Sequence, residues 1–563
     1  MIEPMPRDLG TLARDTFDLV VVGGGITGAA IAHDATLRGL RVALVEKDDF
    51  GGATSAASSK LLHGGVRYLQ QMQFGKVRES AVERAAFQRI APHLCRYVPF
   101  LIPTTRELAK GRALVGAGLG VYQVLTAGAD RGIADATRRA PAPHFVARDE
   151  LVRRYPALEA LAGLTGAWVI HESHMHSSER MTLAFLRTAA AHGAVLANYV
   201  AVDEFLLEGQ RVVGVRARDA ATGAHIEIRA KLVANAAGPW IARLNDRLGL
   251  ARLDRDITGF SKGAHLITRP IVGDTAVALP TRLPNQAIVS RGGRHVFVIP
   301  WRGHALVGTT NVPFDGDLDE VGVSVDEIEV FLDEINQALP SARLTLADVR
   351  HAFAGLYPLT EDVIRPGVYQ GTGAYQLVDH ARSAGLDGLI TVLGAKYTTA
   401  RGLAERAVDL AARRIGVSAK PCASATTPLV GGALNDVASL VREVASLDSH
   451  VDDALARHLV GHYGTEAAGI VALARSRPQG LARLSPLCEV VEAEVVHAVR
   501  HEMALRLDDV VFRRTGLGTL GHPGTPALER AAELMAETLG WDEARRAAEV
   551  ARTHSHFPLG VRS

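Results

Sequence analysis

The stretch that decides the fold is Phe17–Lys47, which reads FDLVVVGGGITGAAIAHDATLRGLRVALVEK in a chain of 563 residues. A short apolar run over 19–22 leads directly into glycines, which is typical of a buried strand that ends in a tight turn. A helical pattern follows, and a second apolar run over 41–45 ends at an acidic residue. The order strand, glycines, helix, strand predicts a Rossmann-like βαβ unit.

The spaced glycines and the acidic residue of this unit each have a physical role. Gly23 permits the tight turn, Gly25 lets the backbone approach a pyrophosphate, and Gly28 lets the helix pack close to the strands. The first turn of the helix offers unpaired N–H groups and a partial positive charge. Glu46 would accept hydrogen bonds from a ribose hydroxyl. We therefore predict a dinucleotide site, although the motif does not identify the dinucleotide.

Composition and charge limit the remaining possibilities. The chain is 47% apolar, and its length predicts three or four domains at about 150 residues each. Its 62 basic and 61 acidic residues give a net charge of +1, which provides no positive field for nucleic acid. The three cysteines favour a reducing compartment, and residues 1–16 lack the apolar segment of a secretory signal. We expect a cytoplasmic protein that does not bind nucleic acid.

Two later segments, 231–244 and 389–406, repeat the pattern of an apolar strand that runs into small residues and a helix. The carboxyl ends of parallel strands meet at one ligand crevice, so these distant segments predict a discontinuous nucleotide-binding domain. The predicted fold is α/β, with an inserted antiparallel-sheet substrate domain and a C-terminal helical domain. The expected boundaries are 1–90, 181–255 and 366–430 for the nucleotide-binding domain, 91–180 and 256–365 for the substrate domain, and 431–563 for the helical domain.

The longest uncharged run, ALVGAGLGVYQVLTAGA over 113–129, is at the short limit for a membrane span and contains four glycines. Basic residues on both sides permit a helix that lies in a membrane surface, which leaves peripheral membrane contact open. The composition favours the other interpretation, a helix buried in the core.

A segment dense in small and hydroxyl residues, GGATSAASSKLLHGGVRYL, follows the acidic residue over 51–69. Its small side chains permit close approach, and His63, Arg67 and Tyr68 suggest an anionic ligand. A capped helix with a solvated arginine is an equally good interpretation of the pattern alone.

Seven motifs together resemble the FAD-dependent glycerol-3-phosphate dehydrogenases, from about residue 18 to about residue 540. The motifs are GGGITG with Glu46, ATSAASSKLLHGGVRYL, NAAGPW, SKGAH, VIPWRGHALVGTTN, LGAKYTTARGLAE and RHEMALRLDDVVFRRTGLG, in this order. The resemblance implies that FAD is the cofactor, that a secondary alcohol is oxidised, and that a membrane quinone takes up the electrons.

The resemblance also assigns residues to the cofactor. The residues implied to bind FAD are Gly23, Gly25, Gly28, Glu46, Thr54, Ser55, Ser58, Ser59, Gly238, Gly394, Lys396, Thr398 and Thr399. The last four are expected to form a helix N-terminus at the flavin pyrimidine edge, where negative charge accumulates when the ring is reduced.

For the reaction, the resemblance implies hydride transfer from the substrate to flavin N5 while a base removes the hydroxyl proton. His265 is the expected base, because a histidine has a pKa near the working pH. His265, Lys396 and Arg67 are the candidate catalytic residues, and Tyr68 and His63 are expected to complete the substrate site. A purely structural histidine is the alternative at both His265 and His63, and an exposed lysine is the alternative at Lys396.

The chain departs from the family pattern where two phosphate-binding arginines are expected. Tyr357 precedes Pro358, and Gly373 stands near the second position; each missing contact to a phosphate would be worth about 1.5–3 kcal/mol. Tyr357 can donate a neutral hydrogen bond, and Arg365 could compensate for one arginine. A different polyol, polyol phosphate or hydroxy acid is therefore an alternative substrate, and a non-catalytic dinucleotide-binding regulator is a remote alternative.

A second departure is the histidine-rich stretch HESHMHSSER over 171–180. Its histidines His171, His174 and His176 have a spacing that could bind a metal, but no sustained helical pattern or paired thiol supports one. We expect a polar loop there, and no metal site.

Overall fold

The structure is a computed structural model that describes residues 3–69, 72–133, 135–250, 259–280, 295–359 and 375–560. The side chains of Arg67, Ala109 and Pro280 are outside this description. The predicted Arg365 and Gly373 also lie outside the described residues.

The nucleotide-binding sheet is built around the βαβ unit that the sequence predicts. Its central strand β1 pairs in parallel with β2 and β10, and β18 continues the parallel order beyond β10. The order along the main path of this 8-stranded sheet is β17-β18-β10-β1-β2-β7, with β8 and β9 continuing antiparallel from β10. The strands are β1 (Thr16–Val22), β2 (Val42–Val45), β7 (Val195–Ala197), β8 (Val200–Glu208), β9 (Arg211–Asp219), β10 (His225–Asn235), β17 (Gln376–Asp379) and β18 (Leu389–Leu393).

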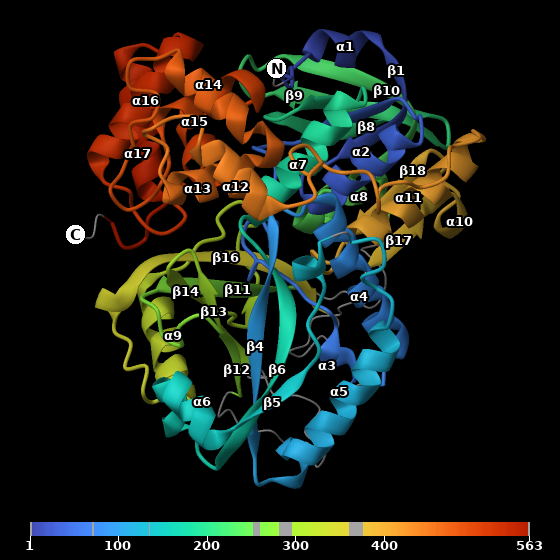
Figure 1. The fold of residues 1–563 in the computed structure, drawn as a ribbon. Helices are drawn as coiled ribbons and strands as arrows, with labels where there is room; N and C mark the ends of the chain where they lie inside the picture. The colour runs from blue at the N-terminus through green and yellow to red at the C-terminus, as the bar shows by residue number, and fades with distance from the viewer. Residues whose placement is uncertain are drawn as a thin grey trace.

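Helices cover one face of this sheet. The helix α2 (Ile26–Leu37) packs between α7 (Ser178–Ala191) and α11 (Ala400–Ile415), and nearly all of its residues are buried. The helix has no solvent-exposed face because the sheet covers one side and other helices cover the other, so even His33 and Asp34 are buried. Three segments distant in the sequence thus share one core, as Figure 1 shows at its upper right. The short α1 (Leu9–Arg14), α8 (Ile241–Asn245) and α10 (His380–Ser383) lie at the margins of the sheet.

The second sheet has 10 strands in the described residues and is antiparallel except for the pair β12 and β4. Its main order is β15-β11-β14-β13-β12-β4-β6-β3, and β16 pairs with β11 along nearly the whole strand. The strands are β3 (Leu61–Leu62), β4 (Cys95–Thr105), β5 (His144–Ala147), β6 (Leu164–Met175), β11 (Gly259–Thr268), β12 (Ala276–Pro280), β13 (His295–Trp301), β14 (His304–Gly308), β15 (Val312–Phe314) and β16 (Val349–Leu359). This sheet is the predicted antiparallel substrate sheet, and both predicted inserts contribute strands to it.

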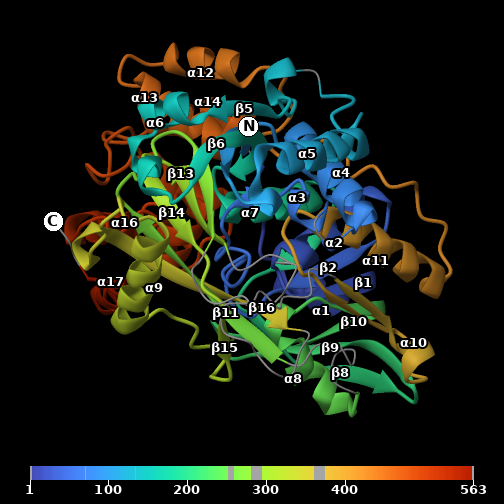
Figure 2. The same ribbon diagram turned by 90° about the horizontal axis from the view of Figure 1, so that it is seen from below.

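Helices α6 (Arg148–Arg154) and α9 (Val325–Ala338) bury one face of the second sheet. On the other side lie α3 (Val66–Leu69), α4 (Phe74–Ile90) and α5 (Arg112–Thr126), with α5 at the outer edge of the molecule (Figures 1 and 2). Only Leu119 and Tyr122 of α5 are buried. The expectation of a core helix over 113–129 is therefore wrong, since periodicity cannot tell which partner covers an apolar face. In the described part of the chain, no helix is both long and apolar enough to cross a membrane.

The C-terminal domain is helical, as predicted, and packs against the nucleotide-binding domain (Figure 1). Two apolar clusters stabilise it, one around α13 and α14 and the other around α15 and α16. Its elements are α12 (Val437–Ala445), α13 (Asp453–Tyr463), α14 (Ala467–Arg475), α15 (Glu492–His501), a π-helix over Asp509–Arg514, α16 (Thr525–Leu539) and α17 (Glu543–Ser555).

The expectation of a polar loop at 171–180 is also wrong. Its first half is the end of β6, and its second half begins α7, with the Ser177 hydroxyl accepting a hydrogen bond from the backbone N–H of Arg180. His174 is completely buried there. The stretch resembles a loop in composition because polar side chains such as His174 and Glu179 are buried inside the protein, which the sequence alone does not show.

Candidate active site

The glycine turn after β1 forms the floor of a large cavity. Gly23 has a φ of +105°, and a Cβ at this position would lie 2.7 Å from the carbonyl oxygen of Ala236. A Cβ on Gly28 would lie 1.9 Å from the carbonyl oxygen of Gly23, so the close contact between helix and turn requires glycine. The start of α2 thus lies at the cavity, which Gly25, Ile26 and Thr27 line, as an anion site at a helix N-terminus requires.

Glu46 lies at the end of β2 and is held by the backbone. Its carboxylate accepts hydrogen bonds from the N–H of Gly24 at 2.7 Å and from the N–H of Asp48 at 2.9 Å. Burial raises the pKa of Glu46, while these two donors stabilise its charged form. The acid is therefore fixed beside the glycine turn, where the ribose of a dinucleotide would lie.

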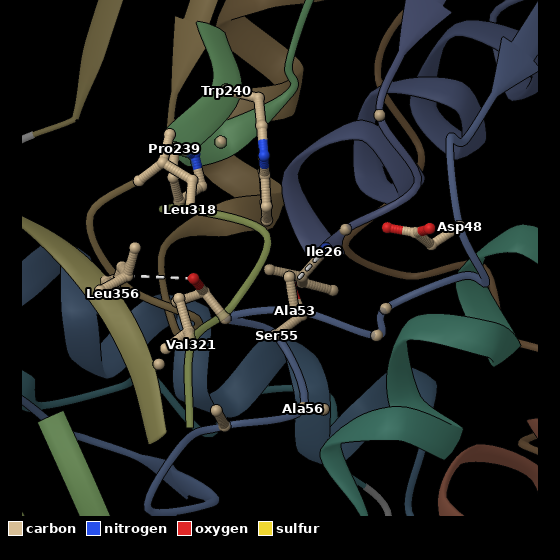
Figure 3. A pocket seen from close by; sticks show the side chains of 18 of the residues that line it. Ile26, Asp48, Ala53, Ser55, Ala56, Pro239, Trp240, Leu318, Val321 and Leu356 are labelled. Carbon is tan, nitrogen blue, oxygen red and sulfur yellow. Dashed lines mark hydrogen bonds between the residues drawn. The ribbon is translucent and has the colours of Figure 1, made fainter. Parts of the chain in front are cut away.

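The segment after β2 crosses the N-terminus of α2. The Ser55 hydroxyl accepts a hydrogen bond from the N–H of Ile26 at 2.9 Å, and the Thr54 hydroxyl donates to the carbonyl of Leu356 in β16 at 3.0 Å. Figure 3 shows Ile26, Ala53 and Ser55 close together, with Trp240 on one side and Asp48 on the other. The segment therefore joins the nucleotide-binding sheet to the second sheet.

These elements enclose a cavity of about 1050 Å³, which extends between the two sheets and reaches the C-terminal helices. Its shape and lining fit a dinucleotide, because glycine backbone, a helix N-terminus and a ribose-binding acid all face it. The predicted residues that line the cavity are Gly23, Gly25, Glu46, Thr54, Ser55, Ser58, Ser59, Gly238, His265, Tyr357, Gly394 and Lys396.

Other predicted residues lie beside the cavity without lining it. The backbone N–H of His63 donates to the Thr398 hydroxyl at 3.0 Å, and the ammonium of Lys396 lies 3.8 Å from the centre of the Tyr68 ring. Gly28 is buried under the glycine turn, and Thr399 is the residue before α11. The helix itself begins at Ala400, so Gly394 and Lys396 belong to the loop before it and not to its first turn as expected. The side chain of Arg67 and all of Arg365 are outside the described residues.

His265 lies on the wall formed by the second sheet. Its ring stacks on Phe353 with the ring centres 5.3 Å apart, and neither ring nitrogen has a hydrogen-bond partner among the described residues. Burial, together with the charge of Lys60, lowers the pKa of His265 to about 3. The expectation of a base with a pKa near neutrality is therefore wrong, because the sequence does not show how deeply the imidazole is buried.

A buried ion pair that the sequence analysis missed also lines the cavity. The ammonium of Lys60 contacts the carboxylate of Glu179 at 2.7 Å and also donates to the Ser178 hydroxyl at 3.1 Å. Lys60 is only 1% exposed and lies 5.2 Å from the centre of the Trp301 ring. The sequence shows Lys60 among small residues, but only a prediction that α7 passes beside it would pair it with Glu179.

The C-terminal domain supplies a second missed set of residues. Arg514 is completely buried and forms two hydrogen bonds to Asp49, at 2.6 and 2.7 Å, and Arg513 contacts the same carboxylate. Tyr199, which lines the cavity, donates to Asp509 at 2.6 Å. The arginines hold the pKa of Asp49 well below its usual value. The helical domain thus fixes two segments at the Glu46 end of the cavity, the one that holds Asp49 and the one that holds Tyr199.

Comparisons with known proteins agree with this architecture. Residues 18–410 match the family of FAD dependent oxidoreductases, and residues 422–546 match the C-terminal domain of alpha-glycerophosphate oxidase. A glycerol-3-phosphate dehydrogenase of Synechocystis is 32% identical over 98% of both chains. The human mitochondrial glycerol-3-phosphate dehydrogenase is 31% identical, over all of this chain and 76% of the human one. The crystal structure of a Bacillus halodurans glycerol-3-phosphate dehydrogenase complexed with FAD has a TM-score of 0.75 and 27% identity, and covers 100% of this chain and 99% of its own.

Proposed function

The chain belongs to the glycerol-3-phosphate dehydrogenase family of FAD-dependent oxidoreductases, and from this membership we propose that it oxidises glycerol 3-phosphate to dihydroxyacetone phosphate. The observation that carries the proposal is that the dinucleotide loops and the wall that holds His265 line one and the same cavity. The fold alone would not identify a reaction, because one fold supports many.

FAD, when bound, supplies the acceptor for a hydride from the carbon that bears the substrate hydroxyl. Burial lowers the pKa of His265 to about 3, which keeps the ring neutral but makes it a weak base in the ligand-free protein. We still assign it the hydroxyl proton, because it lines the cavity and neither ring nitrogen has a partner among the described residues. Lys396 places a positive charge at the same cavity, where it would attract the anionic substrate or the negative charge that develops in the reaction. We assign a substrate contact to Arg67 as well, from the sequence.

Tyr357 supports a second candidate substrate. Its hydroxyl donates a hydrogen bond to the side-chain oxygen of Asn311, which also accepts from Ser261 at 2.6 Å. These groups are neutral, whereas a phosphate dianion is usually bound by arginine or lysine. An uncharged polyol or a hydroxy acid is therefore the alternative to glycerol 3-phosphate in the same site.

The purified protein tests the proposal directly. We expect a yellow protein whose visible absorbance bleaches under anaerobic conditions when glycerol 3-phosphate is added, and a dye acceptor should restore it. One charge-assisted phosphate contact corresponds to roughly a tenfold to hundredfold preference for glycerol 3-phosphate over glycerol in kcat/KM. Faster reduction by glycerol or a hydroxy acid would establish the alternative substrate, and no reduction by any of them would contradict the proposed dehydrogenase activity.

We further propose that a membrane quinone is the electron acceptor and that α5 binds the membrane surface. The side chains of Leu114, Val121 and Val124 lie on one face of α5 and are 53%, 46% and 77% exposed. Leu108, Met72 and Phe74 are exposed on neighbouring segments. The exposed basic residues near this face are Arg78, Arg106, Lys110, Arg112 and Arg131. An apolar face rimmed by basic side chains suits a membrane that contains anionic lipids.

Replacing Leu114, Val121 and Val124 together by glutamate is expected to weaken binding to vesicles with anionic lipid at least about tenfold, because apolar burial is lost and like charges repel. Co-sedimentation with vesicles measures this, and Val330→Glu on α9, at a residue that is 71% exposed, is the matched control. Unchanged flavin reduction by glycerol 3-phosphate would separate membrane binding from catalysis. Equal vesicle binding by the triple variant would contradict the assignment of this face.

A further inference from the structure

Three histidines from two parts of the chain meet outside the cavity. His176 directly follows β6, and His458 and His462 lie one turn apart on α13 of the C-terminal domain. One nitrogen of each ring can be chosen so that all three lie within 4.8 Å of one another. None of the three lines the large cavity, so the cluster is separate from the proposed active site.

The rings of the cluster are close enough to be ligands of one ion. His176 Nε2 lies 3.1 Å from His462 Nδ1, a hydrogen-bond distance, and the ring centres of His458 and His462 are 4.3 Å apart. His462 Nδ1 also lies 3.1 Å from the carbonyl oxygen of His458, so an ion would replace these two hydrogen bonds. Two histidines four residues apart present their rings on the same face of a helix, and a third from another element completes a common set of zinc ligands.

A carboxylate already orients one of these rings. Glu494, at the start of α15, is completely buried and lies 2.9 Å from His458 Nε2, and Tyr463 donates to the same carboxylate oxygen at 3.0 Å. This contact occupies Nε2 and leaves Nδ1 of His458 for a ligand. A carboxylate behind a histidine is the usual support of a metal-binding imidazole, because it fixes the ring and makes it more basic.

The charged side chains around the cluster have opposite effects on the binding of a cation. Only the neutral form of an imidazole binds a metal; His462 is buried and His176 is half-buried. Arg302 lies close to His462: a Cβ built on Gly516 would be 3.0 Å from Arg302 Nη1 and 3.8 Å from His462 Nε2. Its positive charge weakens the binding of a cation, and the negative charge of Glu494 opposes this effect.

We propose that His176, His458 and His462 bind one zinc ion, which joins the end of β6 to the C-terminal helices. Neutral imidazoles favour zinc over magnesium or calcium, which prefer oxygen ligands. The ion would be structural, because its three ligands lie outside the cavity. The proposal departs from the expectation of no metal site, which was argued from His171, His174 and His176; of these, the structure places only His176 beside the two histidines of α13.

The test uses the FAD-loaded protein, stripped of metal with a chelator and then titrated with zinc chloride. We expect about one zinc per chain in the wild type at micromolar concentration, with a higher melting temperature, and less than about a tenth of that in His462→Gln. His144→Gln, at an exposed histidine of β5, is the matched control and should bind zinc like the wild type. Retained FAD and an unchanged circular dichroism spectrum would show that His462→Gln is folded.

A second measurement needs no variant. Cobalt in place of zinc should give the wild type the intense visible absorption of a tetrahedral site, and excess zinc should remove it. Equal zinc binding by His462→Gln, or a wild type that binds no zinc above the level of an unrelated protein, would overturn the proposal.

Discussion

Replacing Lys396 by methionine is expected to slow the reduction of the flavin by glycerol 3-phosphate about a hundredfold or more while FAD remains bound. Lys396 lines the cavity, and its ammonium lies over the Tyr68 ring, 3.8 Å from the ring centre. A fixed charge that stabilises developing negative charge in an enclosed site typically contributes about two to three orders of magnitude in rate. Methionine keeps the length and the packing of the side chain but removes the charge. Stopped-flow bleaching of the flavin absorbance measures the rate.

The matched control for this prediction is Lys231→Met, because Lys231 lies on the surface in an ion pair with Asp18. It should reduce its flavin at the wild-type rate. If Lys396→Met loses FAD instead of slowing, Lys396 is required for cofactor binding and its proposed role in the reaction fails. If its rate is unchanged, the positive charge at this position has no catalytic effect.

Much of the fold could be predicted because its decisive signals are local. The unit of β1, α2 and β2 lies within about thirty residues. Its glycines stand where the backbone makes close contacts, such as that of Gly28 with Gly23. The strands β13 and β14 form a hairpin whose apolar runs and turn stand side by side in the sequence. Such features are specified by neighbouring residues and do not depend on the rest of the chain.

The features that the sequence analysis missed depend on contacts between distant segments. Asp49 and Arg514 are 465 positions apart, and no local pattern pairs them. The apolar face of α5 looked like a core face, since the sequence does not show that nothing covers it. His265 could be chosen as a candidate from its motif, but its pKa depends on burial by Phe353 and on the charge of Lys60. Burial and distant ion pairs therefore required the structure.

Acidification from pH 7 to about pH 5 is expected to unfold the protein and release FAD, because several buried histidines are neutral in the folded state. Burial lowers the pKa of four of them to about 3 and that of a fifth to about 4. The five are His33, His93, His174, His265 and His351. Below pH 6.5 the unfolded chain binds protons at these positions and the folded chain does not, so stability is complete above pH 6.5 and falls with pH down to the folded pKa values.

The size of the effect follows from the number of groups. Each such histidine costs about 1.4 kcal/mol per pH unit in this window, so five cost about 7 kcal/mol per unit, similar to the whole stability of a typical domain. Protonation of His174, His265 or His351 would also place a new charge near buried Lys60, whose charge already lowers the pKa of each. The buried carboxylates Asp49 and Glu502 have lowered pKa values and lose their contribution only below about pH 4.

A pH titration of flavin fluorescence and circular dichroism distinguishes the histidines from the carboxylates. His33 packs its ring edge against Phe185, and neither of its nitrogens has a partner among the described residues. His33→Leu should therefore move the unfolding midpoint to lower pH, since one fewer proton binds on unfolding. His144→Leu, at the surface, should leave the midpoint unchanged. A wild-type midpoint below pH 4 would assign the acid sensitivity to the carboxylates, because the histidines would by then have exerted most of their effect.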